Sequence, residues 1–186
     1  MRETLGAETI GVLLNLLQAH SVLTEALEAR LRRERGVSLA EHEILARLAA
    51  APLGRLRMLD LSQLLLVSKS GVTRLVDRLE KSGLVRREDS PRDRRVIYAL
   101  ITPNGKRVAR ASSPVFVEGI RAHFASHLSE PDVRALQRAL RRILAGNGQW
   151  DEARCCPPFA ERQAGRGNAR KVPVVRRDQE KTRKNA

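Results

Sequence analysis

The chain has 186 residues, of which 35 are Lys or Arg and 21 are Asp or Glu, so its formal net charge is +14. Such an excess of positive charge indicates a polyanionic partner, either a nucleic acid or an anionic membrane surface. No segment approaches the roughly 18–20 apolar residues that span a bilayer, so we expect no membrane partner. The hydrophobic fraction of 42% suffices for a core, which few aromatic residues can enter because they make up only 3% of the chain.

The N-terminus and the cysteines indicate the cellular compartment. The first residues lack the basic, apolar and small-residue regions of a signal peptide. Cys155 and Cys156 are the only cysteines, and two neighbours cannot build a disulfide framework. We therefore expect a cytoplasmic protein and read the two cysteines as incidental rather than as oxidant sensors.

Residues 8–35 are expected to form one long helix. One stripe recurs at spacings of three and four and consists of Leu13, Leu16, His20, Leu23, Leu27 and Leu31, and Gly36 can end the helix. A helix of about 28 residues is long for a small domain, and its apolar stripe must pack against something. A second subunit would provide that surface.

Two shorter helices follow. Ser38 and Glu41 have the form of a capping box, which predicts a helix from there to about Ala50. Pro52 and Gly54 break this helix, and a short amphipathic helix is expected over residues 57–65.

A helix with a basic leading edge is expected between Ser68, a good N-cap, and Gly83, which can adopt the left-handed conformation that ends a helix. One stripe is apolar and should be buried, namely Val72, Leu75, Val76 and Leu79. With the preceding short helix and the tight connection at residues 66–67, this is a helix-turn-helix, whose second helix suits the major groove of DNA. An ordinary surface helix would share this pattern, and the segment after Gly83 decides between them.

After Gly83 the apolar period changes from 3.6 to 2. Residues 84–87 and 95–100 are expected to be strands joined by a polar loop at residues 88–94. A β-hairpin directly after a helix-turn-helix describes a winged helix. Its tip carries Arg92, Arg94 and Arg95.

Two further helices and a tail complete the chain. Thr102 and Pro103 begin a second long helix to about Leu128, in which Pro114 should cause a kink. Ser129 begins a last helix that ends near residue 146. Residues 147–186 hold ten Lys or Arg and five Asp or Glu with no apolar period, and are expected to be a basic, disordered tail.

In this order the segments resemble the MarR family of bacterial transcription regulators. The resemblance rests on residues 56–58 through 66–68, 73–80, 83–87, and 93–95 closing on 100–105. It implies a mainly α fold with a small β-hairpin wing, in which a winged helix-turn-helix lobe (about residues 37–102) joins long dimerisation helices (residues 8–35 and 103–146). The domain would span residues 1–146 of a homodimer. Pro114 and the tail at residues 147–186 depart from the family pattern.

The resemblance also implies roles for charged residues in the wing. It places Arg95 in the minor groove, whose enhanced negative potential suits arginine. It suggests that Asp77 on the recognition helix pairs with Arg95, and that Asp77 and Asp93, which lies two residues before Arg95, brace the wing. A solvated surface acid is the alternative for Asp77.

The other polar side chains are assigned by their chemistry. The candidate DNA-binding residues are Ser68, Lys69, Ser70, Thr73, Arg74, Arg78, Arg92, Arg94 and Arg95. Small hydroxyls suit phosphates or base edges, whereas Arg74 could hold a guanine edge. Arg78, Arg86 and Arg87 are expected to contact the DNA backbone or to be solvated.

The resemblance implies a phenolic or lipophilic effector bound between the dimerisation helices and the lobe. His20 and His42 are the candidates for that pocket, although His20 also fits a core or interface histidine and His42 is expected at the surface. His123 and His127 have a spacing that can bind a metal, but no carboxylate or cysteine completes the set. We expect no metal and no cofactor.

No glycine-rich phosphate loop, nucleophile elbow or clustered acid–base pair is present, so we expect no enzyme. The expected function is sequence-specific binding of double-stranded DNA at a roughly palindromic operator, as a ligand-responsive dimeric repressor. These residues do not distinguish repression from activation. The alternative is a non-specific architectural DNA-binding protein, which the high charge and basic tail also fit.

Overall fold

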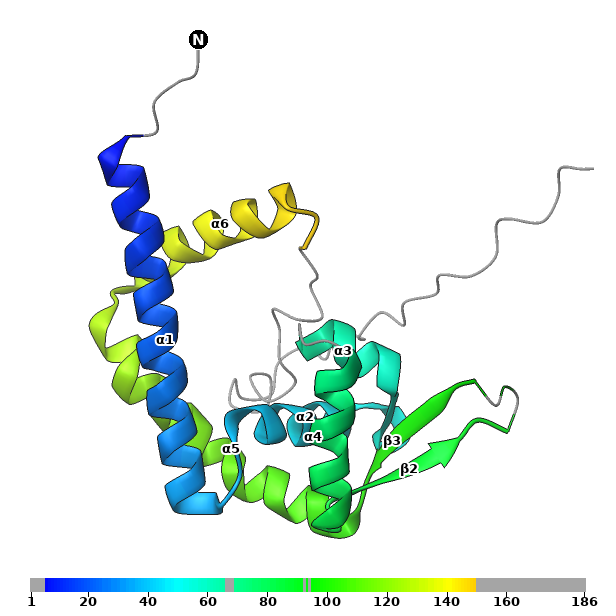
Figure 1. Ribbon diagram of the computed structural model, residues 1–186. Helices are drawn as coiled ribbons and strands as arrows, with labels where there is room; N and C mark the ends of the chain where they lie inside the picture. The colour runs from blue at the N-terminus through cyan, green and yellow to red at the C-terminus, as the bar shows by residue number, and fades with distance from the viewer. Residues whose placement is uncertain (1–5, 66–68, 92, 94, 150–186) are drawn as a thin grey trace, which may run out of the picture.

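The computed structural model describes residues 6–65, 69–91, 93 and 95–149 (Figure 1). The helices are α1 (Ala7–Arg35), α2 (Leu39–Ala50), α3 (Met58–Leu65), α4 (Lys69–Lys81), α5 (Pro103–His123) and α6 (Glu130–Gly146), and the strands are β1 (Arg55–Arg57), β2 (Val85–Asp89) and β3 (Ile97–Ile101). In Figure 1, α2, α3, α4 and the sheet form a lobe, and α1, the end of α5 and α6 form an arm beside it. The expected mainly α fold with a small wing is confirmed.

Local capping signals place the first helices as predicted. Gly36 ends α1 with φ of 69°, and its N–H donates to the carbonyl oxygen of Arg32. At the start of α2, Glu41 N–H donates to Ser38 Oγ over 3.1 Å, and Ser38 N–H donates to Glu41 Oε2 over 2.9 Å. This reciprocal capping box satisfies two backbone N–H groups that no helical carbonyl can reach.

The lobe has its own apolar core. Its buried members are Ile44, Leu45, Leu48, Leu61, Val72, Leu75, Val76, Leu79, Leu84, Val85, Ala99, Ile101 and Ala109. The helices α2, α3 and α4 and the sheet each contribute one face, as the apolar periodicity requires, and α5 adds Ala109. The composition of Leu, Val, Ile and Ala agrees with the low aromatic content.

The sheet contains one strand more than the sequence predicts. β3 pairs antiparallel with β2 and, on its other side, with β1, which gives the strand order β1-β3-β2. β1 has three residues and no readable alternation, so only its pairing with β3 defines it. The hairpin strands lie one or two residues later than expected, because Ser90 N–H still bonds to the carbonyl oxygen of Val96.

A second, smaller cluster joins α5 to α1. Leu31, Val115 and Phe116 are buried there. The helices approach closely at Gly119, where an added Cβ would lie 2.7 Å from Leu27 Cδ2.

The second long helix is shorter than predicted. α5 begins at the cap Thr102 as expected but ends at His123, not near Leu128. Phe124 leaves the helical conformation (φ −128°), and Ala125–His127 form a 3₁₀ turn. The chain then begins α6 with a capping box between Ser129 and Asp132.

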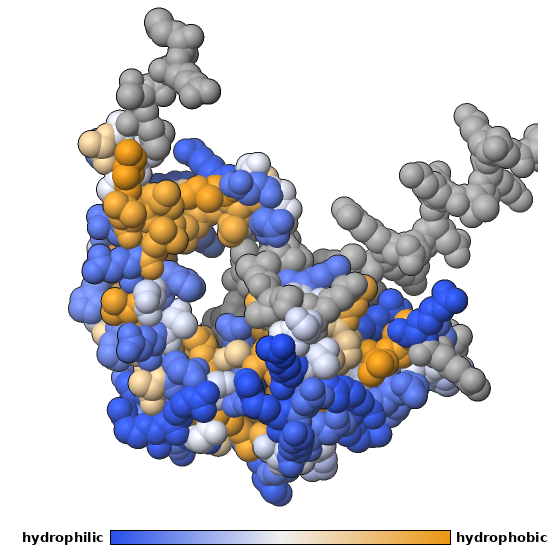
Figure 2. Space-filling model, in the orientation of Figure 1, coloured by the Kyte–Doolittle hydropathy of each residue, from blue (hydrophilic) through white to orange (hydrophobic). Residues whose placement is uncertain are grey.

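The arm exposes apolar side chains. Large hydrophobic residues with 42–63% exposure are Ile10, Val12, Leu13, Leu14, Leu17 and Val22 on α1, and Val133 and Ile143 on α6. Figure 2 shows them as an orange surface over the upper part of α1 and over α6. We call this surface the arm face.

The expectation that no segment could cross a membrane is wrong for α1. By length and composition alone, α1 qualifies, with an 18-residue window of mean hydropathy 1.3, none of which is buried within the chain. The last turn of the helix is nevertheless basic, with Arg32, Arg33 and Arg35.

Candidate nucleic-acid interface

The recognition helix α4 separates its faces as predicted. Val72, Leu75, Val76 and Leu79 are each no more than 8% exposed. Ser70, Thr73, Arg74 and Arg78 are exposed. The expected cap, Ser68, lies outside the described residues. A solvent-facing row of hydroxyl and guanidinium groups on a firmly packed helix can reach base edges and phosphates.

The end of α4 leads directly into the wing. Gly83 adopts φ of 67°, and Leu84 N–H donates to the carbonyl oxygen of Leu79 over 2.8 Å. The hydroxyl of Thr102 donates to the carbonyl oxygen of Gly83 over 2.8 Å. The start of α5 therefore fixes the corner between the recognition helix and the wing.

The pairing predicted between Asp77 and Arg95 is replaced by another. Asp77 Oδ1 lies 2.7 Å from Nη1 of Arg87, which also lies 2.7 Å from Glu80 Oε2. Nη2 of Arg87 donates to the carbonyl oxygen of Thr73 over 3.2 Å. Arg87 on β2 thus holds three residues of α4.

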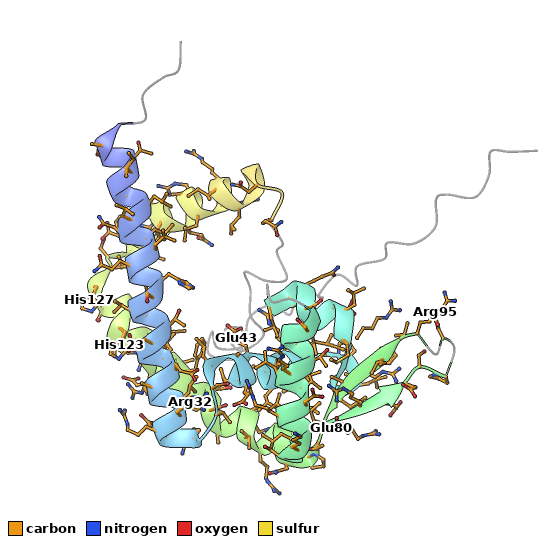
Figure 3. All side chains as sticks on the ribbon, in the orientation of Figure 1. Arg32, Glu43, Glu80, Arg95, His123 and His127 are labelled. Atoms are coloured by element: carbon orange, nitrogen blue, oxygen red, sulfur yellow. The ribbon has the colours of Figure 1, made fainter. Side chains whose placement is uncertain are left out.

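Arg95 lies too far along the hairpin for that role. Figure 3 places it at the wing tip, whereas Glu80 marks the base of α4. Asp93 Oδ1 accepts the N–H of Arg95 over 2.9 Å, so Asp93 shapes the tip itself. Arg92 and Arg94 lie outside the described residues.

The sequence predicts only a solvated or DNA-backbone-contacting charge at Arg87 and does not reveal its role as the brace. Strand alternation could have identified it, since Arg87 lies two residues after the buried Val85 and opposite the buried Ala99. It therefore faces α4, where Asp77 and Glu80 stand three residues apart on one helix face.

Arg78 is not only a candidate DNA contact. Its Nε lies 3.2 Å from Glu41 Oε1, which links α4 to the start of α2. Burial alone would raise the pKa of Glu41, but hydrogen bonds with Ser38 and the contact with Arg78 outweigh it and lower that pKa. The same carboxylate thus caps α2 and orients the recognition helix.

His42 is fully buried, which corrects the expectation that it lies at the surface. Its Nδ1 lies 2.8 Å from Ser112 Oγ, and its ring centroid lies 4.8 Å from that of Phe116. Burial lowers the pKa of His42 to about 4. The prediction failed because α5, which is distant in sequence, covers this face of α2.

The remaining histidines do not converge on a site. His20 is exposed on α1. His123 ends α5 and His127 belongs to the following 3₁₀ turn (Figure 3), so they do not occupy successive turns of one helix. No group of three or more His, Cys, Asp or Glu that could hold a metal occurs among the described residues.

A cleft of about 330 Å³ lies where the end of α1, the start of α2 and the end of α4 meet. Its lining is Arg32, Gly36, Val37, Glu41, Arg78, Leu79, Lys81, Ser82 and Leu84. Neither of the two candidate pocket residues, His20 and His42, lines this cleft.

A helix-turn-helix that leads into a β-hairpin, with the polar face of its second helix open to solvent, defines a winged-helix protein. The model of the MarR family matches residues 35–96. Two solved structures from Streptomyces coelicolor are similar over most of the chain, and both are described as MarR family transcriptional regulators.

The first, Sco3205 in complex with DNA, is 32% identical with a TM-score of 0.75, over 82% of this chain and 94% of Sco3205. The second, AbsC, is 30% identical with a TM-score of 0.74, over 80% of this chain and 99% of AbsC. The chain belongs to the MarR family.

A curated relative matches a shorter region. The uncharacterized HTH-type transcriptional regulator YfiV of Bacillus subtilis (strain 168) is 42% identical over 57 residues, which are 31% of this chain and 36% of YfiV. The chain thus spans about a third of the length of that relative.

Proposed function

We propose that this protein is a homodimeric, sequence-specific DNA-binding regulator of transcription. The observation that carries the proposal is the exposed polar face of α4, held at a fixed angle to the wing by Arg87. The net charge of +14 favours a polyanion. The similar protein Sco3205 was solved in complex with DNA.

In this proposal the two parts of the interface contact two grooves. Ser70, Thr73 and Arg74 on α4 face the major groove, together with Ser68 and Lys69 at its start. The wing tip places Arg95 against the minor groove, where negative potential is strongest. Arg78 and the wing arginines Arg92 and Arg94 contact phosphates.

The arm face supports the homodimer. Its exposed residues on α1 and α6 would be unfavourable in water, whereas a second copy could cover them. Two lobes related by a two-fold axis favour a roughly palindromic operator with half-sites about one helical turn apart. Dimer formation also explains the apolar length of α1 without a membrane, in agreement with a cytoplasmic regulator.

Selection of duplexes from a random library, followed by binding measurements over a salt series, tests the proposal. We expect the selected duplex to bind at least about 10³-fold more tightly than random DNA. Equal affinities with a steep salt dependence would instead establish the architectural alternative.

Regulation by a phenolic or lipophilic effector, and repression as the outcome, form the finer part of the proposal. They are supported by membership of the MarR family. A reporter gene behind the selected operator should be expressed less when the protein is present, and an effector should relieve this. Increased expression would show an activator.

A further inference from the structure

Helix α5 belongs to two separate hydrophobic clusters. Its first half contributes Ala109 to the core of the lobe, with Val108 packed against it. Its second half contributes Val115 and Phe116 to the cluster that includes Leu31 of α1. Figure 1 shows α5 running from beneath the lobe to the side of α1. The helix therefore connects the DNA-binding lobe to the arm.

The backbone of α5 is weakest between these clusters. Pro114 has no N–H, so the carbonyl of Arg110 cannot receive the usual helical bond. Ser112 Oγ donates to the carbonyl oxygen of Val108 over 2.9 Å, and Ser113 Oγ donates to that of Ala109 over 2.7 Å. Such side-chain bonds to the preceding turn often bend helices.

The same short segment is held from outside by both parts of the molecule. Arg35, the last residue of α1, donates from Nε to the carbonyl oxygen of Ala111 over 2.9 Å. His42 of α2 contacts Ser112 through Nδ1. This segment lacks one backbone hydrogen bond of the helix and is bonded from outside by Arg35 and His42. A segment of this kind can bend, and the outside contacts determine its bend angle.

We propose that residues 112–114 of α5 form a joint that sets the distance between the two recognition helices of the dimer, with Arg35 as the positioning residue that fixes its angle. The joint determines which spacing of operator half-sites the dimer accepts. This inference rests on the proposed function, because it requires the dimer and its DNA.

The first test uses pulsed electron–electron double resonance to measure the distance between spin labels on the two subunits of the DNA-free dimer. Spin labels are attached to Ser82→Cys, at the end of α4, in a full-length chain in which Cys155 and Cys156 are replaced by Ser. We expect Arg35→Gln to broaden the distance distribution. Pro114→Ala, which restores the missing N–H, should narrow it and shift its mean.

Arg33→Gln is the matched control. Arg33 lies in the same last turn of α1, and its side chain is 72% exposed and pairs only with the adjacent Glu34 in the described part of the chain. This variant should keep the wild-type distribution, and Arg35→Lys should restore it in part. Circular dichroism checks that every variant is folded.

The second test measures binding to a series of operators in which one base pair is added or removed between the half-sites. Arg35→Gln should lower the preference for the best spacing about threefold, within the range of measured coupling effects. Unchanged distances and an unchanged spacing preference in both variants would overturn the joint while leaving DNA recognition intact. Failure of the wild type to prefer any duplex would overturn the proposed function instead, and the role of the joint in spacing with it.

Discussion

Many of the large apolar side chains are buried in the lobe, whereas on the arm many are exposed. In the lobe, Leu45, Leu48 and Leu61 are fully buried by α2, α3, α4 and the sheet of the same chain. On the arm, Leu13 and Leu17 of α1 are more than half exposed. The core of the lobe is therefore completed within one chain, whereas the described residues leave the arm face exposed, and in the proposed dimer the second copy covers it. Stability of the lobe should not depend on protein concentration, and stability of the arm should.

The largest expected effect is loss of the dimer when charge is placed on the arm face. Leu14→Asp combined with Leu17→Asp should give monomers, because two desolvated carboxylates would face apolar groups of the partner. Sedimentation velocity at several concentrations measures this. Asn15→Asp, on the same turn, is the control and should leave the dimer intact. A dimeric double variant would show that the arm face is not the interface.

The converse change tests the lobe. Leu45→Ala removes a fully buried side chain and should lower the free energy of unfolding by about 2–5 kcal/mol. Urea unfolding should show this loss at every protein concentration. Leu14→Ala, its exposed counterpart, should change only the concentration-dependent part. Equal effects of the two substitutions would contradict the distinction between lobe and arm.

His42 lies where lobe and arm meet, and it makes stability depend on pH. Its folded pKa of about 4 lies below the unfolded value of about 6.5, so the unfolded chain binds the proton first as pH falls. Stability is complete above pH 6.5 and is lost between pH 6.5 and 4, by about 2 kcal/mol at pH 5. Urea unfolding at pH 7 and pH 5 checks this, and His42→Gln should remove most of the difference.

A smaller effect on stability is expected at Arg87, inside the lobe. Arg87→Gln removes the bonds that hold β2 to α4, and since the acids it contacts are partly exposed, the loss should be about 1 kcal/mol. Affinity for the selected operator should fall more clearly, because the wing loses its fixed angle. Arg86→Gln, on the outer face of the same strand, is the control.

Substitution of Arg95 should lower the affinity for DNA without changing the stability of the protein. Arg95→Ala removes an exposed side chain at the wing tip, so unfolding should not change. Operator affinity at fixed salt should fall severely if the wing enters the minor groove. Near-native affinity would remove the wing from the proposed interface.

Sequence reasoning succeeded where neighbouring residues decide the structure. The capping box at Ser38, the helix starts at Thr102 and Ser129 and the helix end at Gly83 all depend on bonds between residues close in the chain. The apolar stripe of α4 was equally readable, because helix periodicity alone separates its buried and exposed faces.

It failed where the partner is distant in the chain. β1 exists only through its pairing with β3, and His42 is buried only because α5 packs over α2. The ion pair that braces the wing shows the same limit. The sequence indicated the acid Asp77 but paired it with Arg95, whereas its partner is Arg87.

By itself, then, the sequence determined the order of the elements, their caps, the face that α4 presents to solvent and the winged-helix class, because local hydrogen bonds and periodicity encode these. The tertiary structure decided which arginine braces the wing, which histidine is buried and where α5 passes from lobe to arm. Those features arise from contacts between residues 10 or more positions apart, such as Asp77 with Arg87 and Arg35 with Ala111. A local pattern indicates the face on which such a residue lies, but it does not specify the partner.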